Sequence, residues 1–245
     1  MKKIVSLVLL LVMLVSALSV VSCSSATVEA KLGLGFATEV GQVDPSVKDN
    51  KDVAGAVNNA VTVAATLFDA NGKLISVDID VLDASVSVAK DGTFTVPAEF
   101  KTKRELGDAY GMKAYAQATY EWYEQADSFE KIAKGKTIDQ IKALVTSEGK
   151  GNQGVIAGGC TIVISDFVKA IEASVNNQKD VTVASDATVS VSVSATATGA
   201  NATATDNGSV TIKHTFSANV AEQSVTGNTE ASFAFTAEGK KPAAN

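Results

Sequence analysis

Two separated stretches of this chain alternate apolar and polar residues with a period of two. In the clearest stretch, Leu74, Ser76, Asp78 and Asp80 share one face of an extended segment, and Ile75, Val77, Ile79 and Val81 share the other. Because successive side chains of a strand point to opposite faces, this pattern predicts a strand with one buried face. Helical patterns occupy only the region between the two stretches, so the sequence predicts an α+β fold.

The first alternating stretch makes residues 24–100 β-rich. Residues 61–68 are a compact run of valine, threonine and alanine, residue types that favour strands. The Asp69-Ala70-Asn71-Gly72 sequence that follows is typical of a turn and predicts a hairpin with the strand from Leu74. Asp91-Gly92 marks a second turn, ahead of a short strand at 93–96.

The middle region, residues 101–177, is expected to be helical. Trp122, Ala126, Phe129 and Ala133 recur at helical spacing and predict one buried stripe, with Gly135 ending the helix. The sequence Thr137-Ile138-Asp139-Gln140 has the form of a capping box and predicts a short helix through residue 145. Ser165 is expected to cap a third helix through its side chain.

The second alternating stretch lies in residues 178–245 and predicts a β-meander. Alternation runs from 181 to 198, a turn is expected at 206–208, a strand at 210–216 and another turn at 226–228. A disordered Ser/Thr-rich stalk is the alternative. Residues 61–71 resemble residues 210–219, which suggests a truncated repeat of the first β-region, although composition alone could produce the match.

The N-terminal segment carries an export signal. Lys2 and Lys3 precede an apolar run over residues 4–18, and Val20-Val21-Ser22-Cys23 closes it. This ending resembles the lipobox of bacterial lipoproteins, which implies that residues 1–22 are removed and that Cys23 receives acyl chains such as palmitate. The alternative is a retained transmembrane helix over residues 4–21. The expected location is extracytoplasmic, on the outer face of the cell membrane, with the membrane itself as a partner.

Composition excludes several classes of function. After removal of the signal, 19 basic residues stand against 27 acidic ones, a net charge of −8 with no basic run. Nucleic-acid binding is therefore excluded. If Cys23 is acylated, Cys160 has no intrachain partner for a disulfide. His214 is the only histidine, so a zinc site or a histidine-based triad lacks its parts, and no metal is expected.

Two short motifs suggest sites but lack what those sites require. Gly135-Lys136-Thr137 looks like the end of a phosphate-binding loop, yet Glu130 occupies the position of the required glycine. Asp78, Asp80 and Asp83 could gather a calcium ion, but no loop of calcium-binding pattern surrounds them. The polar face of a strand explains these aspartates better.

Acidic and aromatic residues gather over residues 105–124. Paired carboxylates beside aromatic rings occur in clefts that bind or hydrolyse sugars, so a hydrolase is a third option. The alternative is a helix with an aromatic core stripe and an acidic face. The acidic members of the group are Glu105, Asp108, Glu121 and Glu124.

The segment Gly158-Gly159-Cys160-Thr161 is the strongest candidate site. Two glycines let the backbone approach a partner closely and leave the Thr161 hydroxyl accessible. A helix is expected to begin a few residues later, and helix N-termini favour phosphate groups. Asp166, in the first turn of that helix, would compete with such an anion. A threonine on a glycine-flanked loop is also a common arrangement without a function.

Together with the following residues 167–171, this segment resembles the Ser/Thr-Gly-Ala-Thr motif and helix of FMN-binding domains in extracytoplasmic lipoproteins and membrane redox subunits. Residues 101–113, the segment 121–125 and Leu32-Gly33-Leu34-Gly35 resemble a clostridial-type group of membrane-immunogen-related surface lipoproteins that carry this domain. The resemblance covers residues 31–177.

The resemblance implies that Thr161 is the acceptor of FMN through a phosphoester installed by a flavin transferase. Gly159 is the motif glycine. Gly158 stands where the family has serine or threonine, Cys160 stands where it has alanine, and Val163-Ile164 replaces the expected Thr-Ser pair. The implied protein is a flavin-based electron carrier that meets a redox partner and has no turnover site of its own. A cofactor-free surface lipoprotein that binds a ligand, the cell wall or a protein is the alternative.

The sequence therefore predicts four regions. They are a signal peptide at 1–22, a tether at 23–30, an FMN-binding-like α+β domain at 31–177 and a β-rich C-terminal region at 178–245.

Overall fold

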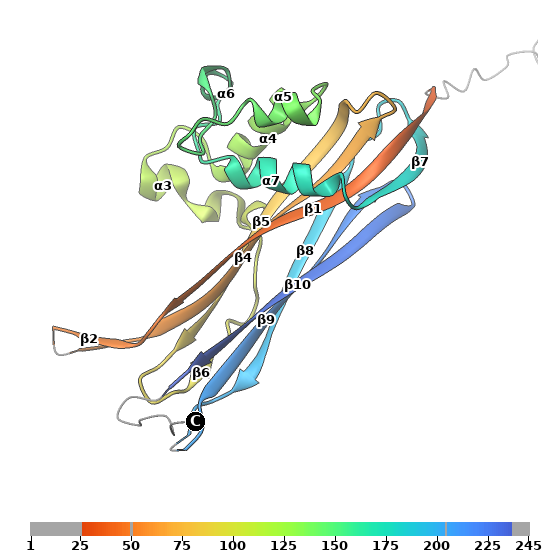
Figure 1. The fold of residues 1–245 in the computed structure, drawn as a ribbon. Coiled ribbons are helices and arrows are strands. Elements are labelled where there is room, and N and C mark those ends of the chain that lie inside the picture. The colour runs from red at the N-terminus through yellow and green to blue at the C-terminus, as the bar shows by residue number, and fades with distance from the viewer. Residues whose placement is uncertain (1–25, 50, 204, 237–245) are drawn as a thin grey trace, which may run out of the picture.

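The computed structural model describes residues 26–49, 51–203 and 205–236 and arranges them in three layers. A five-stranded sheet forms the middle layer, with short helices over one face and a three-stranded sheet over the other (Figure 1). This mixed, strand-rich architecture confirms the expected α+β class. The signal peptide and the proposed anchor Cys23 lie outside the described residues.

The five-stranded sheet is antiparallel throughout and has the order β6-β5-β4-β1-β7. Its strands are β1 (Thr27–Val43), β4 (Gly55–Asp69), β5 (Leu74–Val88), β6 (Phe94–Thr95) and β7 (Gln178–Ala184). The predicted hairpin at residues 69–72 joins β4 to β5, with Leu67 paired to Ser76. A small hairpin, β2 (Ser46–Lys48) with β3 (Lys51–Val53), extends beyond the end of β1.

The second sheet is the predicted C-terminal meander, in the order β10-β9-β8. Its strands are β8 (Ser190–Ala200), β9 (Gly208–Val220) and β10 (Gln223–Phe235). The turn expected at residues 226–228 is wrong, because these residues lie within β10 and pair with Thr215, Phe216 and Ser217 of β9. The reversal instead occurs at Ala221 and Glu222, where Ala221 has φ 49°. Strand pairing over thirteen residues outweighs the local turn preference of Gly227.

The helices of the described residues are short and lie between β6 and β7 in the sequence. They are α2 (Lys103–Leu106), the 3-10 helix η1 (Gly107–Tyr110), α3 (Met112–Ala116), α4 (Trp122–Ala133), α5 (Ile138–Lys142), α6 (Gln153–Ala157) and α7 (Ser165–Ser174). The predicted stripe of α4 is buried, and Thr137 closes a capping box at α5. The cap predicted at Ser165 is wrong. Ile164 occupies the N-cap position without a side-chain bond, and its backbone N–H donates to Gly149 O.

Each face of the five-stranded sheet has its own core. Toward the second sheet lie aliphatic side chains such as Val61 and Val63 of β4, with Ile212 and Phe216 of β9. Toward the helices, Phe68 of β4 meets residues of α4 and α7. The pattern of residues 74–81 predicted that one side of this strand faces solvent, and this prediction is wrong. The hydroxyl of Ser76 and the carboxylate of Asp78 accept hydrogen bonds from backbone N–H groups of Val189 and Val191, so β8 covers that side.

The Leu32-Gly33-Leu34-Gly35 sequence of β1 serves both cores. Leu32 and Leu34 are buried between the two sheets. On the opposite face, a Cβ at Gly35 would lie 2.1 Å from Ala170 O and 2.2 Å from Ser174 N, both in α7. Helix α7 therefore rests directly on the backbone of β1, an approach that only glycine allows.

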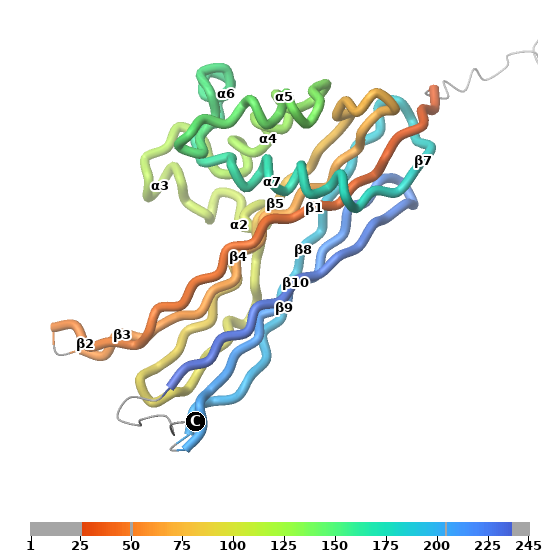
Figure 2. The backbone as a smooth tube through the Cα atoms, in the orientation of Figure 1, coloured from red at the N-terminus to blue at the C-terminus, as the bar shows by residue number. Residues whose placement is uncertain are grey.

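Two region boundaries expected from the sequence move in the structure. Residues 27–30, assigned to the tether, are the first residues of β1 and pair with β7. Residues 178–184, assigned to the C-terminal region, form β7 and belong to the first sheet. Figure 2 follows the chain from α7 through β7 at the sheet edge and across to β8 in the second layer. Residues on both sides of position 177 contribute to the core between the sheets.

None of the helices within residues 26–49, 51–203 and 205–236 is long and apolar enough to cross a membrane.

Candidate functional site

The loop from Gly158 to Thr161 connects α6 to the approach of α7. Gly158 ends α6, and Gly159 has φ 102°, a backbone conformation that strains any residue with a Cβ. At Gly158, a Cβ would lie 2.5 Å from Cδ1 of Ile132. The glycine that departs from the family motif is thus matched by an isoleucine tip that fills the space of a serine or threonine side chain.

Cys160 is fully buried in the core beneath the helices. Burial raises the pKa of its thiol to about 11, so the sulfur stays protonated at neutral pH and is not a reactive thiolate. A buried protonated cysteine packs as a small apolar residue. It therefore fills the structural role of the alanine that the resembling motif has at this position.

Thr161, by contrast, is exposed, and a single side chain on α4 holds it. Gln125 Oε1 accepts a hydrogen bond from the Thr161 backbone N–H at 2.9 Å and another from Oγ at 3.0 Å. Gln125 is 1% exposed, and its Nε2 donates to Tyr120 O at 3.1 Å. The predicted acceptor hydroxyl is thus at the surface and is held from beneath by a buried amide.

Partly exposed apolar side chains flank this loop. Tyr120 is 44% exposed, and its ring would lie 3.5 Å from a Cβ at Gly159. Ile156 is 39% exposed and accepts the backbone hydrogen bond of Gly159, and Val163 is 53% exposed two residues beyond Thr161. An apolar rim of this kind offers surface to a planar ring system or to a docking protein.

A cavity of about 230 Å³ opens at the first turns of α4 and α7, above β1, β4 and β5. Glu39, Asp83 and Asp166 make its lining acidic, with Trp122 as an aromatic wall. Lys103 supplies the basic group of the lining. Its Nζ lies 3.2 Å from Asp83 Oδ2, 5.1 Å from the ring centre of Tyr110 and 5.7 Å from that of Trp122.

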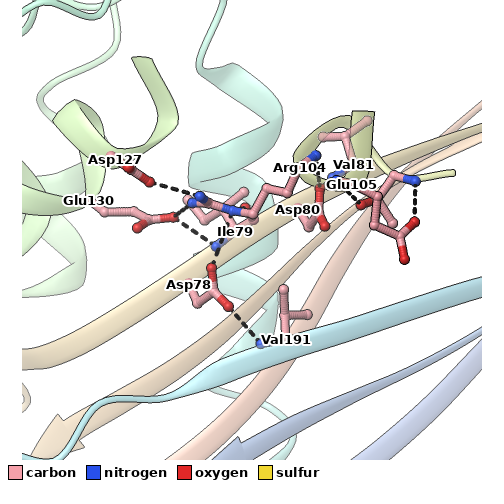
Figure 3. A network of polar contacts seen from close by, with 10 residues as sticks. Asp78, Ile79, Asp80, Val81, Arg104, Glu105, Asp127, Glu130 and Val191 are labelled. Atoms are coloured by element: carbon pink, nitrogen blue, oxygen red, sulfur yellow. Dashed lines mark hydrogen bonds and ion pairs between the residues drawn. The ribbon is translucent and has the colours of Figure 1, made fainter. Parts of the chain in front are cut away.

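Sequence reasoning missed an ion cluster centred on Arg104 at the edge of β5 (Figure 3). The guanidinium contacts Asp127 at 2.7 Å, Glu130 at 2.6 Å and Asp78 at 3.4 Å, and Nε donates to Ile79 O at 2.7 Å. Glu130 Oε1 accepts the Ile79 N–H at 2.9 Å. The cluster thus satisfies edge groups of β5 that have no neighbouring strand there. One signal was available, since Arg104 is the only arginine of the chain.

The ion cluster shifts the acidity of its members. Burial raises the pKa of Glu130 to about 7; the positive charge of Arg104 opposes this shift, and the negative charges of Asp78 and Asp127 add to it. Burial would lower the pKa of Arg104, but the surrounding carboxylates, Glu130 first, raise it overall. Burial also raises the pKa of the Asp80 carboxyl, whose Oδ1 accepts from the Arg104 backbone N–H. With one cation among several carboxylates, we take Glu130 as the group that binds a proton first.

The remaining acidic residues of the predicted acidic and aromatic group serve local structure. Glu105 accepts from the backbone N–H of Thr102, which caps α2, and Asp108 accepts from the hydroxyl of Tyr123. Glu121 is 2% exposed and accepts from the first two backbone N–H groups of α3. Glu124 pairs with Lys113 at 2.6 Å. Glu121 and Glu124 both contact Lys113, Glu121 at the Lys113 backbone N–H and Glu124 at Nζ, so each of the four carboxylates has a structural partner.

The aspartates considered for calcium point to different partners, namely Arg104 for Asp78, backbone N–H groups for Asp80 and Lys103 for Asp83. Within the described part of the chain, no group of three His, Cys, Asp or Glu side chains is placed to hold a metal ion.

A wider hollow, of about 510 Å³, lies on the outer face of the second sheet. It is lined by small uncharged polar side chains from β8, β9 and β10, namely Ser192, Ser194, Thr215, Ser217, Thr226 and Asn228. In the pairing of the sheet they form two rows across three strands. The sequence showed this alternation but not that the hydroxyl-bearing sides of three strands would form one surface.

Part of the chain is similar in sequence to a protein named as a reductase. No protein-family model matches the sequence, and no solved structure matches it significantly. A curated protein named chlorophenol reductase, from Desulfitobacterium hafniense, is 34% identical over 123 residues. The alignment covers 45% of this chain and 36% of that protein, so the chain spans about a third of the length of the relative it matches.

Proposed function

We propose that this protein is a lipid-anchored extracytoplasmic electron carrier that holds FMN on Thr161. The observation that carries the proposal is the exposed Thr161 hydroxyl on a loop shaped by Gly159 and held by Gln125. Gln125 accepts from both the backbone N–H and the hydroxyl of this one surface threonine, which holds the hydroxyl in place. The partial similarity to a protein named as a reductase is in keeping with redox chemistry.

The residues around Thr161 fit a phosphate ester of FMN. A phosphodiester on Oγ carries one negative charge, and the N-terminus of the ten-residue helix α7 begins four residues further along. Asp166 in its first turn opposes that charge, but Lys169 pairs with Asp166 at 2.7 Å and reduces the opposition. Tyr120, Ile156 and Val163 provide apolar surface for the isoalloxazine ring.

Bound FMN would supply the oxidation and reduction, and the chain would supply attachment and exposure. The 230 Å³ cavity is too small to enclose an isoalloxazine ring and a substrate together, because pockets for drug-sized ligands usually exceed about 300 Å³. The flavin would therefore sit at the surface, where a redox partner can approach it. This arrangement suits a carrier rather than an enzyme that turns over a substrate.

The first test is an absorbance spectrum and an intact mass of residues 24–245 coexpressed with a flavin transferase. We expect a flavin band and a mass increase of one FMN, both lost in Thr161→Ala. Thr146→Ala is the matched control, since Thr146 is also an exposed loop threonine but is not part of the motif and bonds within its own loop. An unmodified mass for the unaltered sequence would overturn the proposal.

Membrane attachment through Cys23 is tested separately. The full chain, expressed in a bacterial host, is expected in the membrane fraction and to incorporate labelled palmitate. Cys23→Ala is expected to abolish the incorporation, because the thiol is the acceptor. Labelling of the Cys23→Ala chain at the level of the unaltered chain would exclude this anchor.

A second function is favoured by the hydroxyl-lined hollow on the outer sheet. In this alternative the protein is a cofactor-free lipoprotein that binds cell-wall polymer through Ser, Thr and Asn side chains such as Thr215 and Asn228. A colourless, unmodified protein that cosediments with cell-wall material would support this alternative over the electron carrier.

A further inference from the structure

Gln125 holds Thr161 in a geometry with a consequence for its reactivity. Gln125 lies one turn into α4 and is buried, so few other orientations are open to its side chain. The backbone N–H of Thr161 can only donate, which fixes the amide with its oxygen toward Thr161. The amide nitrogen then donates to Tyr120 O on the other side. Both ends of the amide are thereby satisfied.

The orientation of the amide determines the orientation of the hydroxyl. Because Gln125 Oε1 is an acceptor, the Thr161 hydroxyl contributes its hydrogen to this 3.0 Å contact. Both lone pairs of Oγ are then free to face the exposed side of the loop. A free threonine would rotate among several states, whereas Thr161 is held in one in which the nucleophilic electrons point outward.

We propose that Gln125 is the positioning residue for attachment of FMN to Thr161. The inference rests on the proposed function. In the attachment step, a bond forms between Oγ and the phosphorus of the FMN part of a flavin dinucleotide bound to the transferase. The phosphoanhydride bond breaks, and a nucleoside monophosphate leaves with the electron pair. A neutral amide is too weak a base to take the hydroxyl proton. As the bond from Oγ to phosphorus forms, this proton leaves its contact with Gln125 Oε1 and passes to a base of the transferase.

Positioning predicts a loss of rate that packing alone would not produce. Holding a nucleophile in a reactive orientation contributes strongly to rate, and small misplacements cost roughly 10- to 100-fold. Gln125→Met keeps the length of the side chain and its place beside Met112 but removes the acceptor. Gln125→Glu keeps an acceptor for both Thr161 groups and adds a carboxylate that can take the hydroxyl proton.

The test measures initial rates of flavin attachment on the full chain, purified without flavin and mixed with purified transferase and flavin dinucleotide. Attachment is followed by the mass of the peptide that contains Thr161, with acceptor concentration and pH varied. Ser128→Ala is the matched control, because Ser128 faces the same loop one turn along α4 but donates to Glu124 O and not to Thr161.

We expect Gln125→Met to lower kcat by roughly 10- to 100-fold while KM for the chain stays within about twofold. Ser128→Ala should keep both constants. Gln125→Glu should exceed Gln125→Met in kcat and acquire an inflection in its pH–rate profile that the unaltered chain lacks. The inflection carries the test if Gln125→Met fails to fold, as monitored by Trp122 fluorescence.

The outcomes distinguish a failure of the proposed function from a failure of the positioning role of Gln125. Absence of flavin attachment on the unaltered chain overturns the proposed function. Attachment to the unaltered chain, together with an unchanged kcat in folded Gln125→Met or a Gln125→Glu profile without a new inflection, overturns the positioning role alone.

Discussion

The two faces of the five-stranded sheet are covered in different ways, and the candidate site lies on only one of them. Between the sheets the core is mainly aliphatic and continuous along the strands, with Val61, Leu82 and Ile212 fully buried. The core beneath the helices contains a cluster of aromatic rings, in which Phe167 meets Trp122 and Phe129 with ring centres 5.7 Å and 5.6 Å apart. The helical cover is made of short elements joined by loops, and one of those loops presents Thr161. The strands of the sandwich are continuous, whereas the interrupted helical cover leaves loops such as the one with Thr161 at the surface.

A polar arrangement also lies on each side of the five-stranded sheet, and the two differ in charge. Between the sheets, Asn59 of β4 and His214 of β9 form a neutral pair, with Nδ2 and Nδ1 3.3 Å apart. Burial lowers the pKa of His214 to about 4. Beside the helical core, the Arg104 cluster is charged, and burial raises the pKa of Glu130 to about 7 against the opposing charge of Arg104. The first pair links the middle strands of the two sheets, and the second closes a sheet edge.

Replacing one buried side chain in each core tests whether the two cores unfold together. Phe129→Ala removes a fully buried ring beneath the helices and should lower the free energy of unfolding by about 3–5 kcal/mol, and Ile212→Ala between the sheets by about 2–5 kcal/mol. Because β4 and β5 contribute to both cores, each variant should shift the whole molecule. Chemical denaturation followed by Trp122 fluorescence and by far-ultraviolet circular dichroism should give coincident midpoints. A Phe129→Ala chain in which only the fluorescence transition moves would show that the helical layer unfolds by itself.

The next prediction concerns the loss of stability at low pH that comes from His214 in the core between the sheets. The pKa of His214 is about 4 when folded and near 6.5 when unfolded, so the unfolded chain binds the extra proton between these values. The contribution of His214 is therefore complete above pH 6.5 and is lost as the pH falls toward 4. At about 1.4 kcal/mol for each pKa unit, the loss is about 3 kcal/mol.

The double variant Asn59→Leu with His214→Leu removes the titrating group together with its partner, which avoids leaving one polar group unpaired. Its free energy of unfolding, measured by denaturant titration from pH 4 to 7, should lack this acid-dependent loss. The same loss in the double variant would assign it to another group.

The smallest effect has the opposite sign and belongs to the helical side. The pKa of Glu130 is about 7 when folded and near 4.5 when unfolded, so the folded chain holds the extra proton in this window. Its contribution is complete below pH 4.5 and is lost as the pH rises toward 7. Because the pair with Arg104 opposes the shift, we expect a loss of about 1–3 kcal/mol.

Glu130→Gln keeps an oxygen that can accept the Ile79 N–H and removes the titration. Between pH 4.5 and 6.5 the two contributions oppose each other in the unaltered chain. In the Glu130→Gln chain, the free energy of unfolding should therefore rise more steeply with pH than in the unaltered chain. In the Asn59→Leu, His214→Leu chain, it should fall as the pH rises. If the free energy of unfolding changed with pH in the same direction in both variants, His214 and Glu130 would not act in opposite directions.

The two β-segments that resemble each other in sequence are the middle strands β4 and β9 of the two sheets. They lie across the sandwich core from each other, where Asn59 meets His214. Both segments contribute side chains to the same core, an environment that favours similar residues. Local patterns located these two strands, but they predicted a turn at Gly227 where the pairing of β10 with β9 forms a strand.

The sequence by itself determined the periodic elements. The α4 stripe, the Thr137 capping box and the strands at residues 61–68, 74–81 and 210–216 follow from local spacing, which needs no knowledge of neighbours. Local spacing identified neither β1 nor the break between β7 and β8. The sequence also singled out Thr161 on its glycine loop. Tertiary structure decided which partners these residues meet: Gln125 beneath Thr161, α7 on Gly35, and Arg104 at the edge of β5. These contacts join residues 25 to 139 positions apart, and their specificity comes from packing and hydrogen-bond geometry that a one-dimensional pattern does not contain.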